Sequence, residues 1–287
     1  IYPLPLHDAL PTFAINRRNN NEAQILDTTE IKGPLDHAVP VLSVTTPDGA
    51  PLALLFGYAC HCTTLDGYEW SGDYAGFAQL AVERAHPGCT ALFFAGCGSN
   101  MNPMPRRTVA LAEQFGDELA AAVERTLKEG PTPLDATLTA AYAETELPLE
   151  PAPTRETLAA IAAPEYMRIA AQTLIAELDA GRPLRTSYPY PIQVWRLGAQ
   201  PLVALGGETV VDYAIAIKKL LGRDTFVLGY SNDVMAYIPS ETVLAEGGYE
   251  GATAQLIYGL PAKWKPGIEK QILDTVTTLS NQSGITK

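Results

Sequence analysis

The chain has 287 residues, of which 47% are hydrophobic, so it can bury the core of one large domain and is not globally disordered. Its formal net charge of −12 argues against nucleic acid or an anionic membrane as the main partner. No apolar run approaches the length needed to cross a bilayer.

The start of the chain differs in character from the rest. Residues 1–11 resemble the conceptual translation of a sequencing adapter, so residues 1–12 are predicted to be a non-native leader and residues 13–287 a single domain. A genuine proline-rich arm is the alternative. The four cysteines, at positions 60, 62, 89 and 97, match no structural zinc module. They are predicted to be buried small hydrophobes, and a disulfide between neighbours stays open.

Apolar runs bounded by turn residues predict the elements of the first half. In chain order these are a loop at 13–36, strands at 39–44 and 51–59, a helix at 74–84, a strand at 89–95 and a helix at 106–129. Predicted strands and helices continue to alternate in the second half. Its predicted elements are a strand at 138–149, a helical segment at 153–179, paired strands at 192–197 and 201–205, a helix at 209–221, a strand at 225–229 and a helix at 266–279 that holds Pro266 in its first turn. The pattern predicts an α/β domain of mixed α+β layers, with mixed β-sheets flanked by helices.

Three of the predicted strands are followed by side chains that can bind a metal. His61 follows the strand at 51–59, Glu208 follows the strand at 201–205, and Tyr237 lies in the polar loop after the strand at 225–229. Loops at strand ends commonly carry ligands and catalytic groups. Each residue also has an ordinary explanation, as a core histidine, a carboxylate at a helix start or a packed tyrosine. Spacing alone does not decide between these interpretations.

Several separated motifs resemble one known family in the same order. They are FGYACHCTTL, SGDYAGFA, ALFFAGCGSNMNP, ALGGET and GYSNDVMAYIPSETVLAEGGYEG. Together they resemble the amidase domain of the neutral, non-lysosomal ceramidase family, from about Phe13 to the end of the chain. The resemblance implies a zinc ion bound by His61, Glu208 and Tyr237, with Tyr249 near the scissile amide. It also implies that Arg17 orients the substrate head group, although Arg17 could equally be a solvated loop charge.

The sequence departs from the family's pattern in two places, and each departure removes a group that the family uses. The family has a second zinc histidine in an earlier loop, and His7, His37 and His86 do not match its motif, so the chain is expected to lack the first segment and one ligand. Asn102 stands where the family has its nucleophilic serine, and an amide nitrogen is no nucleophile at neutral pH.

The expected function is therefore zinc-dependent hydrolysis of a linear N-acyl amide by metal-activated water, with Tyr249 and Asn102 donating to the oxyanion. Asp73 is expected to cap a helix, or else to orient His61. The alternative is a catalytically silent homologue that binds a lipid or carbohydrate head group, and a weaker third hypothesis is an esterase using Cys97 or Ser99. A small-molecule or lipid amide is the expected partner, and the resemblance alone favours an extracytoplasmic location.

Overall fold

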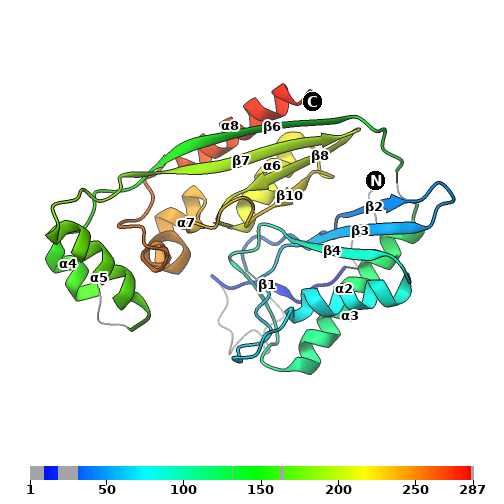
Figure 1. Cartoon of the computed structure of the whole chain (residues 1–287), viewed down its shortest axis with the longest axis horizontal. Coiled ribbons are helices and arrows are strands. Elements are labelled where there is room, and N and C mark those ends of the chain that lie inside the picture. Colours follow the sequence, from blue (N-terminus) through cyan, green and yellow to red (C-terminus); the bar gives the residue numbers. More distant parts are fainter. Residues whose placement is uncertain (1–9, 19–31, 131, 162–164, 286–287) are drawn as a thin grey trace.

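The computed structural model describes residues 10–18, 32–130, 132–161 and 165–285. The two larger β-sheets, each covered by its own helices, lie edge to edge in an elongated molecule (Figure 1). The mixed α/β class predicted from the sequence is confirmed. Within the described residues, no helix combines the length and the apolar character needed to cross a membrane.

The first sheet has the strand order β2-β3-β4. Strands β2 (Val41–Thr45) and β3 (Pro51–Tyr58) pair antiparallel, whereas β3 and β4 (Thr90–Ala95) pair in parallel. Helix α2 (Asp73–Ala85) makes the crossover between the parallel strands and packs beside helix α3 (Val109–Lys128).

The second sheet has the order β10-β8-β7-β6. Its strands are β6 (Leu138–Pro148), β7 (Ser187–Leu197), β8 (Gln200–Leu205) and β10 (Phe226–Leu228). The first three are antiparallel and β10 is parallel to β8. Helices α6 (Val211–Leu221) and α8 (Ile268–Gln282) bury their apolar faces against the core of this sheet.

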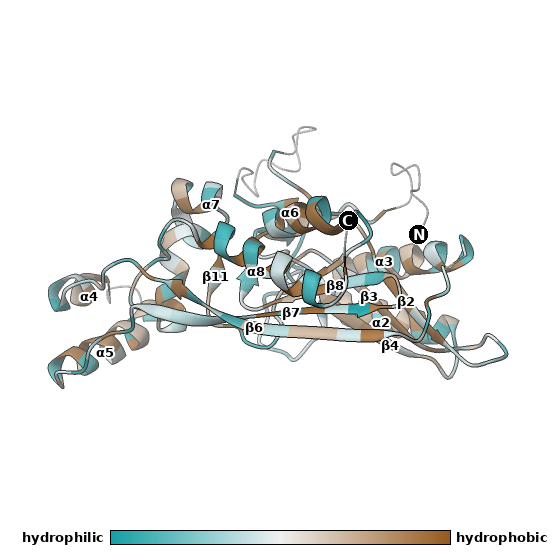
Figure 2. Ribbon diagram, turned by 90° about the horizontal axis from the view of Figure 1, so that it is seen from above, coloured by the Kyte–Doolittle hydropathy of each residue, from teal (hydrophilic) through white to brown (hydrophobic). Residues whose placement is uncertain are grey.

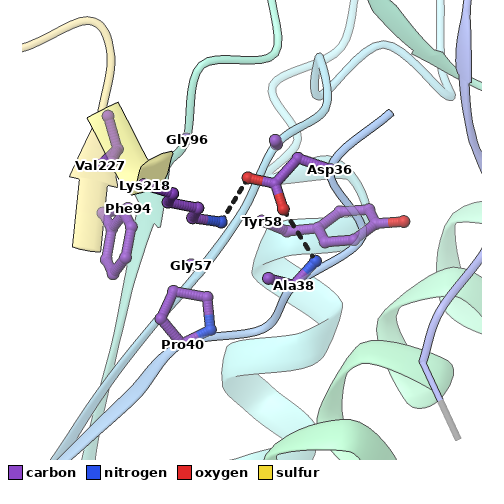
Figure 3. Close-up of a pocket in the computed structure, with 10 residues that line it drawn as sticks. Asp36, Ala38, Pro40, Gly57, Tyr58, Phe94, Gly96, Lys218 and Val227 are labelled. Atoms are coloured by element: carbon purple, nitrogen blue, oxygen red, sulfur yellow. Dashed lines mark hydrogen bonds and ion pairs between the residues drawn. The ribbon is translucent and has the colours of Figure 1, made fainter. Parts of the chain in front are cut away.

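The two sheets meet along a seam between β4 and β10. Gly96 and Leu228 form an antiparallel bridge, and the Gly229 N–H donates to the Ala95 carbonyl at 3.0 Å. Lys218 on α6 reinforces the seam with a 2.5 Å ion pair to Asp36 (Figure 3). The hollow beside this pair has about 10 Å³ of space. That is room for about one water molecule, so the hollow is not a ligand site.

Short elements gather beside the seam and position the functional side chains. Strand β1 (Ala14–Asn16) pairs with β5 (Met101–Pro103), and β9 (Glu208–Thr209) pairs with β11 (Tyr237–Ile238). Helix α7 (Glu241–Glu246) leads into two helical turns, η1 (Tyr249–Thr253) and η2 (Ala254–Tyr258).

A helical hairpin projects from one end of the molecule (Figure 2). It consists of α4 (Arg155–Ile161) and α5 (Glu165–Asp179), and these two helices account for the helical segment predicted at 153–179. Leu158 and Met167 pack with Leu256 of η2, so a small apolar cluster joins the hairpin to the body.

Several sequence-based expectations were wrong. The loop expected at 13–36 contains β1, which forms because its residues pair with β5 and are buried. The last helix begins at Ile268 with Gly267 as its N-cap, so Pro266 lies outside it. The four cysteines are free, and Cys62 is exposed rather than buried.

The predicted leader falls largely outside the described residues, and so does His7. At its end, Leu10 packs partly against the first core, and the Pro11 carbonyl accepts a 2.6 Å hydrogen bond from the Tyr58 hydroxyl.

Candidate metal and catalytic centre

His61 lies directly beyond β3, where β5 holds its backbone. Its N–H donates to the Met101 carbonyl at 3.0 Å, and the chain approaches Gly98 so closely that a Cβ there would lie 2.3 Å from the Cys60 nitrogen. Burial lowers the pKa of His61, and the nearby Arg17 lowers it further, against an opposing effect of Glu208. The imidazole is therefore neutral at pH 7, the form that binds a metal.

Glu208 and Tyr237 are brought side by side by the two shortest strands. They are register partners in the parallel β9–β11 pair. Gly207 makes the tight turn before Glu208 with a φ of +67°, and its N–H donates to the Asp233 carbonyl at 2.7 Å. Both residues are almost fully buried, with exposures of 7% for Glu208 and 4% for Tyr237.

The donor atoms of these three residues converge. His61 Nε2 lies 3.8 Å from Glu208 Oε2 and 3.4 Å from the Tyr237 hydroxyl. Ligands about 2.0–2.1 Å from a tetrahedral zinc ion lie roughly 3.3 Å from one another, so this spacing fits the metal. Among the described residues, no group of three histidine, cysteine, aspartate or glutamate side chains could hold a metal. A metal held at this point would therefore need the tyrosine oxygen as its third protein donor.

The other ring nitrogen of His61, Nδ1, has a hydrogen-bond partner of the kind that favours metal binding through Nε2. His61 Nδ1 lies 3.3 Å from the Tyr230 hydroxyl, which donates to Glu208 Oε2 at 3.1 Å. When the ring proton resides on Nδ1, the Nδ1–H donates a hydrogen bond to the Tyr230 oxygen, and the Tyr230 hydroxyl donates its own hydrogen bond to Glu208. Nε2 is then free of a proton, although the Ser99 carbonyl at 2.7 Å competes for it in the other tautomer.

Glu208 receives a second phenol from η2. The Tyr258 hydroxyl donates to its other oxygen, Oε1. Burial raises the pKa of both Tyr230 and Tyr258, and the charge of Glu208 raises each further. Both phenols are therefore neutral donors at pH 7, and they hold the carboxylate in one orientation.

Arg17 brings a positive charge to the same place from the end of β1. Its Nε donates to Glu250 Oε1 at 2.7 Å, its Nη2 donates to the Tyr237 hydroxyl at 3.2 Å, and its Nη1 lies 3.4 Å from Asn102 Oδ1. Glu250 also accepts from Arg18 at 2.6 Å. Burial works to raise the pKa of Glu250, but Arg17 and Arg18 lower it overall, so the carboxylate is ionised.

Tyr249 forms the open side of the centre. Its ring packs at 5.2 Å against Tyr237, and the Arg17 guanidinium lies 5.5 Å from its centroid. Tyr249 is 42% exposed, so part of this residue is open to a bound molecule. Burial is the main cause that raises its pKa, which keeps the phenol protonated as a hydrogen-bond donor.

The structure thus brings together six of the residues singled out in the sequence. These are Arg17, His61, Asn102, Glu208, Tyr237 and Tyr249. The sequence assigned no role to Tyr230, Tyr258 or Glu250. Tyr230 and Glu250 lie inside the quoted motifs, but only the fold shows which way they face.

Asp73, Cys97 and Ser99 were the other candidates. The Asp73 carboxylate accepts from the backbone N–H groups of Leu65 and Tyr74, so it fixes the loop after His61, and no described contact joins it to the imidazole. Cys97 and Ser99 are fully buried, and burial raises the pKa of the Cys97 thiol to about 12. Neither presents a reactive nucleophile, which argues against the esterase hypothesis.

Comparison with known proteins places this fold. No family model matches the sequence, and no curated protein matches it significantly. Among solved structures, the chain is similar to the neutral ceramidase from Pseudomonas aeruginosa, with 18% identity, a TM-score of 0.64, and coverage of 96% of this chain and 51% of that one. A structure described as ceramidase complexed with C2 matches with 15% identity, a TM-score of 0.65, and coverage of 98% and 54%. The chain therefore has the fold of the neutral ceramidases over about half the length of those structures, as the sequence motifs predicted.

Proposed function

We propose that the chain carries the catalytic face of a zinc-dependent amidohydrolase that acts on a linear N-acyl lipid amide. The observation that supports this most strongly is that three donor atoms lie close together. Glu208 Oε2 is 3.8 Å and the Tyr237 hydroxyl is 3.4 Å from His61 Nε2. The shared fold adds support, because both matched structures are described as ceramidases.

His61, Glu208 and Tyr237 would hold the zinc ion. When bound there, zinc supplies Lewis acidity and activates water at a pH near 7. The neutral state of His61 and the two phenol donors to Glu208 prepare the donor set for the ion. One further ligand from outside the described residues would complete a tetrahedral protein site.

Arg17, Tyr249 and Asn102 would bind and orient the amide. Tyr249 is partly exposed and carries a phenol O–H, and the Asn102 amide nitrogen can donate because the Asn102 oxygen already faces Arg17. Two neutral donors and a cation fit a developing oxyanion. One such donor is typically worth about 2.7–4 kcal/mol of barrier.

A chelation experiment tests the proposal. The protein that carries this chain is assayed on ceramide and on simpler N-acyl amines, before and after chelator treatment and after zinc is restored. We expect chelation to abolish turnover and zinc to restore it, with less than one zinc ion per chain in Glu208→Gln. Turnover that is insensitive to chelator would contradict the metal mechanism.

Asn102 favours a second candidate, a silent homologue that binds a lipid or carbohydrate head group. An amide at this position removes the side-chain nucleophile and keeps a hydrogen-bonding group. The same experiment separates the two candidates. Stoichiometric zinc with turnover supports the hydrolase, whereas saturable binding of ceramide without turnover or bound zinc supports the silent homologue.

A further inference from the structure

Two aromatic side chains project from the loop at 66–72, between β3 and α2. Tyr68 and Trp70 have relative exposures of 108% and 105%, so both are as open to solvent as in an extended peptide. Among the described residues, the next most exposed large apolar side chain is Ile169, at 73%. Two such rings together present about 300–500 Å² of surface, the size of patch that marks an interaction site.

The base of this loop is fixed although its tip is open. The Asp73 carboxylate accepts hydrogen bonds from the Leu65 N–H at 2.9 Å and from the Tyr74 N–H at 2.7 Å. The Thr64 carbonyl accepts a further bond from the Arg107 N–H at 2.6 Å. The two rings are thus carried on a closed base, so little ordering entropy is lost when they bind.

The same base joins the loop to the edge of the catalytic centre. Thr64 follows His61 by three positions, and its partner Arg107 lies in the turn after β5. Burial lowers the pKa of Arg106, and the positive charges of Arg107 and Arg17 lower it further, so this turn lies within electrostatic range of Arg17. A surface bound by the two rings is therefore held close to the centre.

The charges around the rings balance one another. The loop carries Asp66 and Glu69, and the adjacent turn carries Arg106 and Arg107, with Arg107 Nε 3.4 Å from Asp66 Oδ2. Two negative and two positive side chains leave no net charge here, whereas the whole chain has a net charge of −12. An anionic membrane would repel the chain, but a zwitterionic membrane would not.

The two rings are of the types that lie at the boundary between lipid and water. Tryptophan and tyrosine combine an apolar ring with one polar group, and they are enriched at the headgroup level of membranes. Arginine side chains beside them can keep their charged heads among the phosphates. Aromatic anchors at protein interfaces sit in pockets at the centre of a broad contact. Tyr68 and Trp70 instead flank the charged Glu69 at a loop tip, which fits a deformable lipid surface.

We infer that Tyr68 and Trp70 dock the chain on the surface of a zwitterionic lipid bilayer, with both rings in the headgroup region. Docking requires the loop alone. Delivery of a lipid amide from the docked bilayer to the catalytic centre rests on the proposed function.

Vesicle sedimentation tests the docking. The protein that carries this chain is mixed with phosphatidylcholine vesicles, and the bound fraction is compared for the wild type, Tyr68→Ser/Trp70→Ser and Tyr142→Ser, with each fold checked by circular dichroism. Tyr142 is the matched control, because it is 51% exposed on β6, outside the loop. We expect the double substitution to weaken binding about 10-fold or more, since each ring can bury roughly 100 Å² of surface, and the control to leave it unchanged. Unchanged binding in the double variant, or no binding of the wild type, would overturn the proposal.

Lipid composition separates the rings from the arginines as the cause of binding. We expect vesicles that contain phosphatidylserine to bind the wild type more weakly than pure phosphatidylcholine, because the net charge of −12 opposes an anionic surface. Tighter binding to phosphatidylserine would show that Arg106 and Arg107 drive the contact, and it would overturn the proposal.

Quenching by brominated phosphatidylcholine locates Trp70. We expect quenching of tryptophan emission in the wild type and its loss in Trp70→Phe, because Trp264 is fully buried and Trp195 lies on β7 of the other sheet. Equal quenching in both proteins would contradict the insertion of Trp70. If the double substitution instead converts a dimer to a monomer and leaves vesicle binding unchanged, the rings belong to a contact with a second copy.

These binding measurements need neither zinc nor turnover, so failure of the hydrolase proposal would leave them standing. Where turnover is found, the double variant should keep its activity on a water-soluble, short-chain N-acyl amine and lose activity on ceramide in vesicles. Full activity of this variant on ceramide in vesicles would overturn the delivery of substrate by the loop.

Discussion

Arg17 Nε donates a 2.7 Å hydrogen bond to Glu250 Oε1, and the same guanidinium reaches the Tyr237 hydroxyl at 3.2 Å. Glu250 thereby fixes the cation that lies against a candidate metal ligand. The side chain of Glu250 is 5% exposed and that of Arg17 is 23% exposed, so water screens this pair only in part.

Glu250→Gln should therefore destabilise the protein and disturb the centre. Removing one partner of a fully buried pair costs about 3–5 kcal/mol, and the partial exposure of Arg17 reduces this to an expected 1–3 kcal/mol. Denaturant unfolding measures the change. Glu246→Gln is the control, because its side chain is 46% exposed and pairs with Arg18, and it should cost about 0–1 kcal/mol. Equal effects of the two substitutions would contradict the assigned role of Glu250.

Tyr230→Phe removes the hydroxyl between His61 Nδ1 and Glu208 Oε2. Loss of a group that orients metal ligands typically weakens metal binding by about 10- to 100-fold, and we expect zinc affinity to fall within this range. Competition with a chelating dye measures the affinity. Tyr188→Phe serves as the control, since it removes a hydroxyl that binds Asp233 at 2.7 Å. An unchanged zinc affinity in Tyr230→Phe would show that the phenol does not orient the donors.

Stability should depend on pH through His61. Because burial and Arg17 lower its folded-state pKa below the ordinary value of 6.5, the unfolded chain takes up the proton first on acidification. The contribution is thus fully present above about pH 6.5 and is lost as the pH falls below it. Urea unfolding in chelator at pH 8 and pH 5 should show a larger loss for the wild type than for His61→Asn. A smaller loss in the wild type would mean that the folded-state pKa is raised instead.

Gly98→Ala should displace the bend that supports His61. Its Cβ would lie 2.3 Å from the Cys60 nitrogen, a backbone atom that cannot move independently. Overpacking of this kind typically costs about 1–3 kcal/mol. Gly67→Ala provides the control, because no atom lies within 4 Å of its added Cβ, and it should change stability by no more than about 0.5 kcal/mol. Thermal and denaturant unfolding compare the two, and equal stability would contradict the close approach.

The sequence predicted elements well where hydrophobicity is periodic or continuous. The buried run of β3 and the amphipathic α3 were both found, within a few residues of their ends. The two-residue strands β9 and β11 carry no period that a sequence can reveal, because pairing across the fold defines them. Glu208 and Tyr237 could be singled out only by their place after strands and by the family motifs. Glu250 could not be singled out, since its role depends on Arg17 from the far end of the chain.

The seam between the two sheets also sets the order in which the centre can form. Arg17 and His61 flank strands of the first sheet in the sequence, whereas Glu208, Tyr237 and Glu250 come from the segments after strands β8 and β10 of the second sheet. The sequence separation of Arg17 and Glu250 is 233 positions. We expect contacts over such separations to form late in folding, because the loop between them must first be closed. Each sheet can collapse around its own apolar cluster, but the centre exists only after the two have docked. Activity would therefore report on the last step of folding, and a loosened seam would silence the centre while most of the secondary structure remained.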